Sequence, residues 1–113
     1  MNKTKLPEAG EVVVLDFPGV TGTKRRPAVI VSSDLYHKER PDVIVGLITS
    51  QIGSATAATD YLLRDWEVAG LRLPSAFRAF LITVPRSAIT ARVGKLSGSD
   101  WQAVRERITV AMM

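Results

Sequence analysis

The sequence predicts a mainly β fold with a helix (α+β), in the form of a small antiparallel β-barrel closed by a C-terminal helix. Three observations carry this prediction: short runs of β-branched and aromatic residues follow one another, turn residues separate them, and the C-terminal segment changes to helical periodicity. With 113 residues, the chain has the length of one domain that can bury a core. We expect a single domain over 1–113, with residues 1–7 as a flexible tail.

Five segments have the composition of strands. The first, "EVVVLDF" at residues 11–17, has apolar residues on both faces, so both faces are expected to be largely covered. A break over "PGVTGT" follows, and Pro27 biases Arg26 toward extended dihedral angles where the second strand begins. The second to fifth strands are expected at 27–33, 43–51, 61–66 and 76–85, with a polar connection, "LYHKERPD", after the second.

The C-terminal segment predicts a helix over residues 100–111. Ser99 and Gln102 have the spacing of a capping box. Charged residues lie off one helical face, on which apolar residues recur. These apolar residues are Trp101, Val104, Ile108 and Met112. We expect this helix to lie on the sheet.

Composition narrows the classes of function. The chain has no cysteine, which excludes disulfides, thiolate nucleophiles and sulfur-ligated metals and fits a reducing cytoplasm. No apolar stretch approaches the roughly 20 residues that cross a bilayer, and residues 1–10 lack the core of a signal peptide. We therefore expect a cytoplasmic protein. A formal net charge of +4 and a pI near 9.9 suggest a polyanionic partner without requiring one.

Common nucleotide and metal signatures are missing from the sequence. It contains neither a phosphate-binding P-loop nor a glycine-rich dinucleotide fingerprint. His37 is the only histidine, and the acidic residues near it have no metal-ligand spacing, so an exposed loop position is the favoured interpretation of His37. We expect no metal and no other cofactor.

The densest positive charge lies where Lys24, Arg25 and Arg26 are consecutive. Charge alone favours a solvated turn that keeps the protein in solution. Three features favour a site instead: glycine precedes the cations, Pro27 follows them, and the apolar strand behind Pro27 would hold Arg26 in position. The planar guanidinium of arginine can bind two oxygens of one phosphate, whereas lysine offers a mobile point charge.

A second polar stretch, "ITSQ" at residues 48–51, follows the apolar third strand. Successive side chains of a strand point to opposite faces, so at most one of Thr49 and Ser50 shares a face with Gln51. A threonine here is in itself ordinary strand composition, with its hydroxyl bonded to backbone. Taken alone, the stretch favours this structural interpretation.

At these two stretches the sequence resembles the MazF/PemK family of toxin–antitoxin ribonucleases. "GEVVVLDF" is similar to the family's opening strand, "RRPAVIVSSD" to its arginine-proline signature, and "DVIVGLITSQ" to its threonine-bearing strand. Farther along, "AGLRLPSAFR" and "GKLSGSDWQAVRERI" are similar to its later connection and final helix. These segments follow the family's order over nearly the whole chain.

The resemblance implies an SH3-like β-barrel of the CcdB/MazF type that is usually a homodimer. It also implies the toxin of a type II toxin–antitoxin system, a sequence-specific endoribonuclease that cuts single-stranded RNA without a metal, arrests growth and is silenced by a partner antitoxin. The family's active arginine falls on Arg26, directly before Pro27, and its active threonine falls on Thr49. Further RNA contacts are expected at Lys24, Arg25, Ser50, Gln51 and Arg86.

The sequence departs from the family pattern in two places. The loop in "VTGTKRR" is shorter than in many relatives and has no acidic residue, which leaves the base preference open. The usual arginine-threonine step before the last helix is absent from "LITVPRSAIT", where Arg86 lies nearby but out of pattern. The role of Arg86 is therefore open.

The expected reaction is attack by the RNA 2′-hydroxyl on the adjacent phosphorus, which alignment and electrostatics can accelerate. Arg26 would bind the scissile phosphate and stabilise its developing charge; protonation of the leaving 5′-oxygen by Arg26 is less favoured, because guanidinium groups rarely deprotonate. Thr49 would donate to a nonbridging oxygen, while Lys24 and Arg25 hold the RNA backbone. The products would carry a 2′,3′-cyclic phosphate and a 5′-hydroxyl. An antitoxin would cover this site with an acidic flexible segment.

Two other functions stay open. A CcdB-like toxin would bind and poison DNA gyrase through the exposed end of the C-terminal helix, "ITVAMM", and would not need Arg26. An inactive relative would bind RNA or serve as an interaction module. The combination of "RRP" and "ITSQ" favours the ribonuclease over both.

Overall fold

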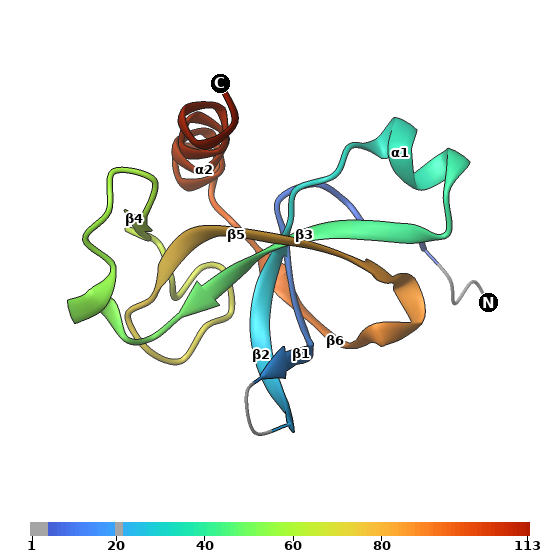
Figure 1. The fold of residues 1–113 in the computed structure, drawn as a ribbon, viewed down its shortest axis with the longest axis horizontal. Helices are drawn as coiled ribbons and strands as arrows, with labels where there is room; N and C mark the ends of the chain where they lie inside the picture. The colour runs from blue at the N-terminus through green and yellow to red at the C-terminus, as the bar shows by residue number, and fades with distance from the viewer. Residues whose placement is uncertain (1–4, 20–21) are drawn as a thin grey trace.

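One antiparallel sheet organises the computed structural model, which describes residues 5–19 and 22–113. The strand order in this sheet is β4-β5-β3-β2-β1-β6 (Figure 1). Its strands are β1 (Glu11–Gly19), β2 (Gly22–Ile30), β3 (Asp42–Thr49), β4 (Tyr61–Leu62), β5 (Ala76–Pro85) and β6 (Ile89–Lys95). The helices are α1 (Asp34–Glu39) and α2 (Gly98–Met112), with short 3₁₀ helices η1 (Ile52–Ser54) and η2 (Arg86–Ala88).

The sheet is open, so the prediction of a closed barrel is not confirmed. β4 and β6 form its two edges, and within the described residues they do not pair with each other. The sheet is nevertheless strongly curled where β5 crosses β3 (Figure 1). The α+β class and the C-terminal helix are confirmed.

Both faces of the sheet carry a hydrophobic core. Val12 and Val29 belong to the core that also includes Val104 of α2, whereas Val13 and Ala28 belong to the core on the opposite face. Adjacent residues enter opposite cores because side chains alternate along a strand. The expectation that residues 11–17 are covered on both faces is therefore confirmed. We call the two sides the α2 face and the opposite face.

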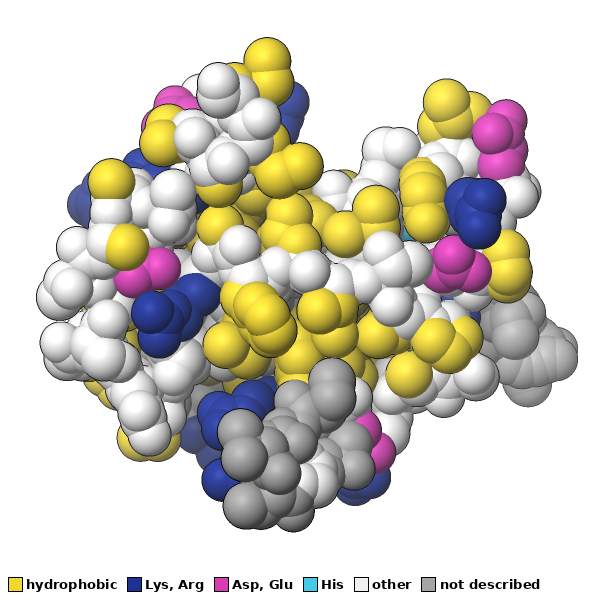
Figure 2. Space-filling model, in the orientation of Figure 1, with side chains coloured by type: hydrophobic (Ala, Val, Ile, Leu, Met, Phe, Trp, Pro, Cys, Tyr) yellow, Lys and Arg dark blue, Asp and Glu magenta, His cyan; other side chains and the backbone are white. Residues whose placement is uncertain are grey.

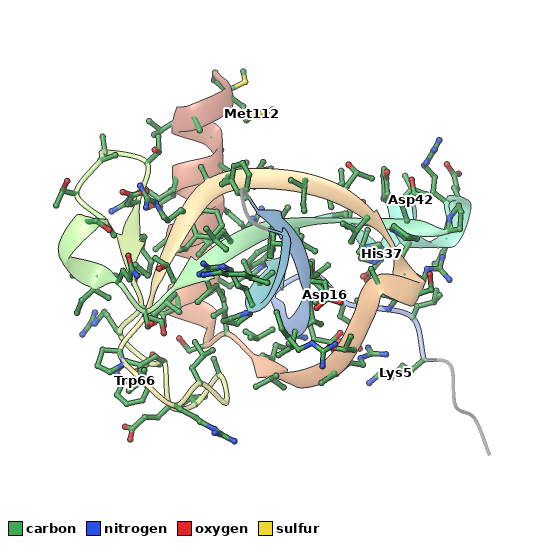
Figure 3. The ribbon with its side chains drawn as sticks, turned by 60° about the horizontal axis from the view of Figure 1, so that its bottom comes forward. Lys5, Asp16, His37, Asp42, Trp66 and Met112 are labelled. Atoms are coloured by element: carbon green, nitrogen blue, oxygen red, sulfur yellow. The ribbon has the colours of Figure 1, made fainter. Side chains whose placement is uncertain are left out.

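The helix α2 begins earlier than expected and has a different cap. Ser97, and not Ser99, is the N-cap, because its hydroxyl accepts a hydrogen bond from the Asp100 backbone at 3.2 Å. Val104 is fully buried, and Trp101 and Ile108 pack against the core of the α2 face. Met112, expected on the buried face, is 68% exposed at the free end of the helix (Figure 3).

The predicted strand over 61–66 is cut short after Leu62. The carboxylate of Asp100 accepts hydrogen bonds from the backbone of Arg64 at 3.1 Å and of Asp65 at 2.8 Å. It also accepts one from the Tyr61 hydroxyl at 2.6 Å. These bonds draw the chain toward the start of α2 and away from β5, so strand pairing stops.

The edge strand β6 is absent from the sequence prediction. It lacks fully buried residues, so it does not show the alternating apolar pattern on which the prediction of strands depends. Arg92 of β6 donates to the carbonyl oxygens of Lys5 at 2.7 Å and Leu6 at 3.1 Å, which holds this segment beside the edge (Figure 3). Residues 5–6 are thus bound, while residues 1–4 of the expected tail lie outside the described part of the chain.

The prediction that His37 lies on an exposed loop is wrong. The polar connection contains α1, capped by Ser33, and His37 is fully buried beneath it. Its Nε2 lies 2.6 Å from the hydroxyl oxygen of Ser32. A helix turns one residue of an otherwise polar segment inward, and six residues are too few for a clear helical period in the sequence.

Candidate active site

The three consecutive cations lie on a strand and not in a turn. β2 begins at Gly22, so Lys24, Arg25 and Arg26 are already paired with β1, where Arg26 lies opposite Leu15. Alternation along β2 places Lys24 and Arg26 on the opposite face, together with Ala28, and turns Arg25 to the α2 face. The expectation that Arg26 is held in an extended backbone is confirmed. The break expected over residues 18–23 is shorter than predicted, because β1 extends to Gly19 and β2 begins at Gly22; residues 20–21 lie outside the described part of the chain.

Pro27 explains why β2 and β3 separate beside Arg26. The two strands pair only from Ala28 to Ile30 of β2. Beyond that ladder, the Val31 amide donates to the Ile44 carbonyl of the β3 strand at 2.9 Å. In an antiparallel pair, every second backbone amide of a strand points toward the same neighbouring strand. The next such donors would be at residues 29 and 27, and proline has no amide hydrogen. Pairing therefore stops, and a gap remains between Arg26 and Thr49.

A cleft of about 240 Å³ lies at this gap, on the opposite face. Arg26 and Thr49 both line it, and we call it the Arg26–Thr49 cleft. Its complete lining consists of Phe17, Arg26, Leu47, Thr49, Gln51, Arg78 and Phe80. The structure thus brings together three of the residues predicted for the site, Arg26, Thr49 and Gln51.

A β-bulge turns two further side chains into the cleft. Gly46 of β3 pairs with Leu81, but the next residue, Leu47, pairs with Arg78, so two residues of β5 have no partner on β3. Such irregularities re-aim side chains and are common next to active sites. Here Arg78 and Phe80 both line the cleft, and Phe80 is 54% exposed with its ring 6.3 Å from that of Phe17.

The hydroxyl of Thr49 is held in position for donation. Its oxygen accepts a hydrogen bond from the Gln51 backbone at 3.1 Å, and Thr49 is only 7% exposed. Within the described residues the hydroxyl proton has no protein acceptor. A ligand oxygen in the cleft could therefore accept that proton without breaking an existing bond.

The arginines near the gap differ in their partners. Arg25 is paired with Asp16, Nε to carboxylate oxygen, at 3.2 Å, and Arg78 lies 3.6 Å from Asp60. In the part of the chain that the structure describes, Arg26 has no acidic partner. Lys and Arg side chains gather beside the β1–β2 hairpin, next to hydrophobic side chains over the crossing of β3 and β5 (Figure 2). The guanidinium of Arg26 is thus free to bind an anion.

The other predicted site residues lie outside this cleft. Ser50 and Arg25 line a second cavity, on the α2 face, and Lys24 is exposed on β2. Arg86 is half-buried away from both and donates through Nη2 to the carbonyl oxygens of His37 at 2.5 Å and Arg40 at 2.6 Å. It binds the end of α1, so its geometry gives no support to RNA binding.

The sequence interpretation missed Phe17, Arg78 and Phe80. "AFRAFLITVP" alternates as a strand, but the bulge that aligns Arg78 with Leu47 is a property of pairing and leaves no local signal. The only available signal was an arginine, Arg78, within a largely apolar strand that also holds two phenylalanines.

The described residues contain neither a metal-binding cluster nor a membrane-spanning helix. No group of three His, Cys, Asp or Glu side chains among them lies close enough to hold a metal ion. Neither of the two described α-helices is both long and apolar enough to span a membrane.

Comparison with known families identifies the chain. A sequence model described as "PemK-like, MazF-like toxin of type II toxin-antitoxin system" matches residues 8–112. The chain belongs to this family. The MazF/PemK resemblance of the sequence is therefore confirmed, and the cleft described above lies in the matched region. No curated protein matches the chain.

Solved MazF-type structures share the fold of this PemK/MazF-family chain. A mycobacterial endoribonuclease in complex with its cognate antitoxin is 18% identical, with a TM-score of 0.76 and coverage of 94% of each chain. MazF in a MazE–MazF complex from Deinococcus radiodurans is also 18% identical, with a TM-score of 0.75 and coverage of 96% of this chain and 97% of that one. The Mycobacterium tuberculosis toxin MazF-mt6 is 24% identical, with a TM-score of 0.68 and coverage of 88% and 94%.

Proposed function

We propose that this PemK/MazF-family chain is the toxin of a type II toxin–antitoxin system and a metal-independent endoribonuclease that cuts single-stranded RNA. The observation that carries the proposal is the meeting of Arg26 and Thr49 in one cleft, across a gap in the sheet. The endoribonuclease names of two of the similar structures support the same activity.

The reaction follows from the groups in the cleft. The 2′-oxygen bonds to the adjacent phosphorus, the bond from phosphorus to the 5′-oxygen breaks, the 2′-hydroxyl loses its proton to solvent, and the 5′-oxygen gains one. Arg26 stabilises the negative charge that grows on the phosphoryl oxygens, and Thr49 donates to one of these nonbridging oxygens. The products carry a 2′,3′-cyclic phosphate and a 5′-hydroxyl. Proton delivery by Arg26 is not required.

The remaining lining suits a single strand of RNA. Phe80 offers an exposed aromatic face, on which an unpaired base can stack. Gln51 and Arg78 add an amide and a second guanidinium to the same cleft. Lys24 lies on the same side of β2 and would attract the backbone beyond it.

The same cations define the expected partners. We infer an antitoxin whose acidic, flexible segment covers the Arg26–Thr49 cleft and so excludes RNA, as two of the similar structures are complexes with an antitoxin or MazE. We also infer a homodimer in the cytoplasm, where RNA cleavage would arrest growth.

Substitution of the two central residues tests the activity. Purified protein is incubated with a long single-stranded RNA in EDTA, and the new ends are mapped. Wild type should yield 5′-hydroxyl ends and leave single-stranded DNA of the same sequence intact, because DNA has no 2′-hydroxyl. Arg26→Ala and Thr49→Ala should each lower kcat by at least about a hundredfold, the usual cost of losing one donor to developing charge.

A matched control makes this result specific. Arg105→Ala removes an exposed arginine of α2 that lines neither cavity, and it should cleave like wild type. Full cleavage by Arg26→Ala would contradict the site. Intact RNA together with trapped gyrase–DNA breaks would instead support a CcdB-like poison acting through the exposed end of α2, at Val110, Met112 and Met113.

A further inference from the structure

A second cavity lies on the α2 face of the same gap between β2 and β3. It has a volume of about 550 Å³, within the range of roughly 300–1,000 Å³ that is usual for small-ligand pockets. Its walls come from β1, β2, β3, β6 and the connection over residues 70–75. Arg72 lies on that connection, and we call the cavity the Arg72 pocket.

The rim of the Arg72 pocket is cationic. Arg25, Arg26 and Arg72 line it, and its described lining contains no carboxylate. Arg25 uses its Nε for Asp16, which leaves its terminal nitrogens for other acceptors. Arg72 is exposed and, as far as the chain is described, has no acidic partner. A rim of this kind is suited to phosphate oxygens.

Half of the residues that line the Arg72 pocket have apolar side chains, beside its arginines and two serines. Its apolar lining residues are Val14, Pro27, Ile48, Leu71, Leu73 and Val93. Ile48 is 1% exposed, whereas Leu73 is 58% exposed. An apolar wall beside cations matches a nucleotide, whose flat base packs on the wall while its phosphate meets the rim.

Two glycines bring the outer wall directly onto β6. Gly70 has a φ of +86°, and a Cβ there would lie 2.6 Å from the Val93 carbonyl oxygen. A Cβ on Gly94 would collide with the carbonyl group of Ala69. Backbone thus packs on backbone, which fixes Leu71 and Arg72 relative to the sheet before any ligand arrives. The pocket is preformed.

Side-chain alternation joins the pocket to the proposed cleavage site. Arg26 and Thr49 serve the Arg26–Thr49 cleft, while their chain neighbours Arg25 and Ser50 line the Arg72 pocket. Arg26 borders both cavities. A polyanion bound at Arg26 therefore meets the second cationic rim on the other side of the gap.

We propose that the Arg72 pocket binds the nucleotide next to the cleaved bond of the substrate RNA, with its base on the apolar wall and its phosphate at Arg72. This inference rests on the proposed ribonuclease function and extends it, because a base-sized pocket at a fixed distance from the scissile phosphate would contribute to the choice of cleavage site. The apolar wall behind the arginines favours an RNA strand over an acidic protein segment, because a base can pack on this wall and a carboxylate cannot.

The test combines substitution with RNA chemistry. The probe is a single-stranded RNA with 2′-O-methyl groups, which can bind but cannot be cut, and its affinity is measured by fluorescence anisotropy over a range of salt concentrations. Arg72→Ala should weaken binding about tenfold and lower the salt slope by about one. With unmodified RNA it should raise KM and change kcat less than twofold. Arg105→Ala is the matched control.

A second series locates the base. Probes with one abasic nucleotide are compared position by position, and wild type should lose affinity sharply at one position next to the cleaved bond. Leu73→Ala, which truncates an exposed side chain of the wall, should reduce that loss without affecting folding. The absence of any such position would overturn the inference.

Other outcomes separate this inference from the function on which it rests. Cleavage by wild type together with an unchanged KM for Arg72→Ala would overturn the pocket but leave the ribonuclease. No cleavage by wild type would overturn the proposed function itself. Normal RNA affinity together with loss of antitoxin binding or of the dimer in Arg72→Ala would show that the pocket receives a protein, and would also overturn the inference.

Discussion

Phe80 is the exposed member of a pair of neighbouring aromatic residues. Its neighbour Phe17 is 3% exposed, yet Phe80 keeps 54% of its surface in solvent at the border of the Arg26–Thr49 cleft. A single exposed aromatic residue is common on proteins. Phe80 shares its cleft with Arg26, which has no acidic partner among the described residues, and with the Thr49 hydroxyl, so the proposed function uses it as a platform for a base beside the scissile phosphate.

Replacing the Phe80 ring should weaken RNA binding more than it weakens the fold. We expect Phe80→Leu to lower the affinity for a 2′-O-methyl RNA by about 5- to 150-fold, since one base stacked on an aromatic residue is worth about 1–3 kcal/mol. The free energy of unfolding in urea should change by less than about 1 kcal/mol, because the ring is largely exposed. Leu35→Ala, which truncates an exposed side chain on α1, is the control. Equal effects of both variants would contradict a stacking role.

The stability of the fold should depend on the protonation of Tyr61 at alkaline pH. Burial, and then the hydrogen bond to the Asp100 carboxylate, raise the pKa of Tyr61 to about 12 from the usual 10.0. Because the folded state holds this proton more tightly than the unfolded state, the stabilisation is complete below pH 10 and is lost as the pH rises through about 12.

The free energy of unfolding of wild type should therefore exceed that of Tyr61→Phe by a margin that shrinks at alkaline pH. We expect wild type to be more stable than Tyr61→Phe by a constant margin up to about pH 10, with the margin shrinking above it. Urea denaturation at a series of pH values measures the margin, and phenolate absorbance follows the titration. The sequence contains one other tyrosine, so Tyr36→Phe serves as the control. A margin that stayed constant to pH 12 would contradict the assignment.

Among the elements, α1 depends on a residue of η2, directly after β5. Arg86, in η2, donates to two carbonyl oxygens at the end of α1, and His37 lies buried beneath that helix. A short helix has little stability of its own. The segment is therefore held by tertiary contacts, which explains why its sequence resembles a polar loop.

Arg86→Ala should loosen α1 without affecting the chemistry. We expect the free energy of unfolding to fall by about 1–3 kcal/mol, the usual cost of losing hydrogen bonds from a charged group. Cleavage by the folded protein, at a temperature well below its melting point, should match that of wild type. Urea denaturation and the RNA assay measure the two effects. Unchanged stability together with a raised KM would favour the alternative role of Arg86 in RNA binding.

The sequence predicted elements best where apolar residues alternate or recur strongly. Strands β1, β2, β3 and β5 and the helix α2 follow such patterns, so their existence could be predicted. β6 could not, because an edge strand does not have to be buried, and β4 was overestimated because the Asp100 carboxylate captures the backbone that follows it. Pairing and capture depend on distant residues, which local patterns do not contain.

The residues of the candidate site also differ in whether the sequence could predict them. Arg26 and Thr49 could be placed in it by motif resemblance, and the structure brings both to one cleft. Phe80 and Arg78 could not, because they reach it through a bulge between β3 and β5. The partner of Arg86 was also beyond prediction, since Arg86 and α1 are distant in the chain.

Across the whole molecule, basic side chains are paired with acidic ones at the β6 edge, but less completely at the gap between β2 and β3. Glu11 pairs with Arg92 at the β6 edge, and Glu8 pairs there with Lys95. Of the arginines that line the two cavities, Arg25 and Arg78 have acidic partners, whereas Arg26 and Arg72 have none among the described residues. Local concentration of charge increases the rate at which a polyanion is captured.

Pro27 stands where the hydrogen-bonded ladder between β2 and β3 ends, and both cavities lie beside this end. A residue with an amide hydrogen at this position could bond to β3 and continue the ladder, bringing the strands to the usual spacing of about 4.7–4.9 Å. Such a sheet would gain one backbone hydrogen bond and would have its two faces sealed from each other beside Arg26. Because the nitrogen of Pro27 lacks a proton, a ligand can instead bind beside the end of this ladder without breaking a backbone hydrogen bond between the two strands.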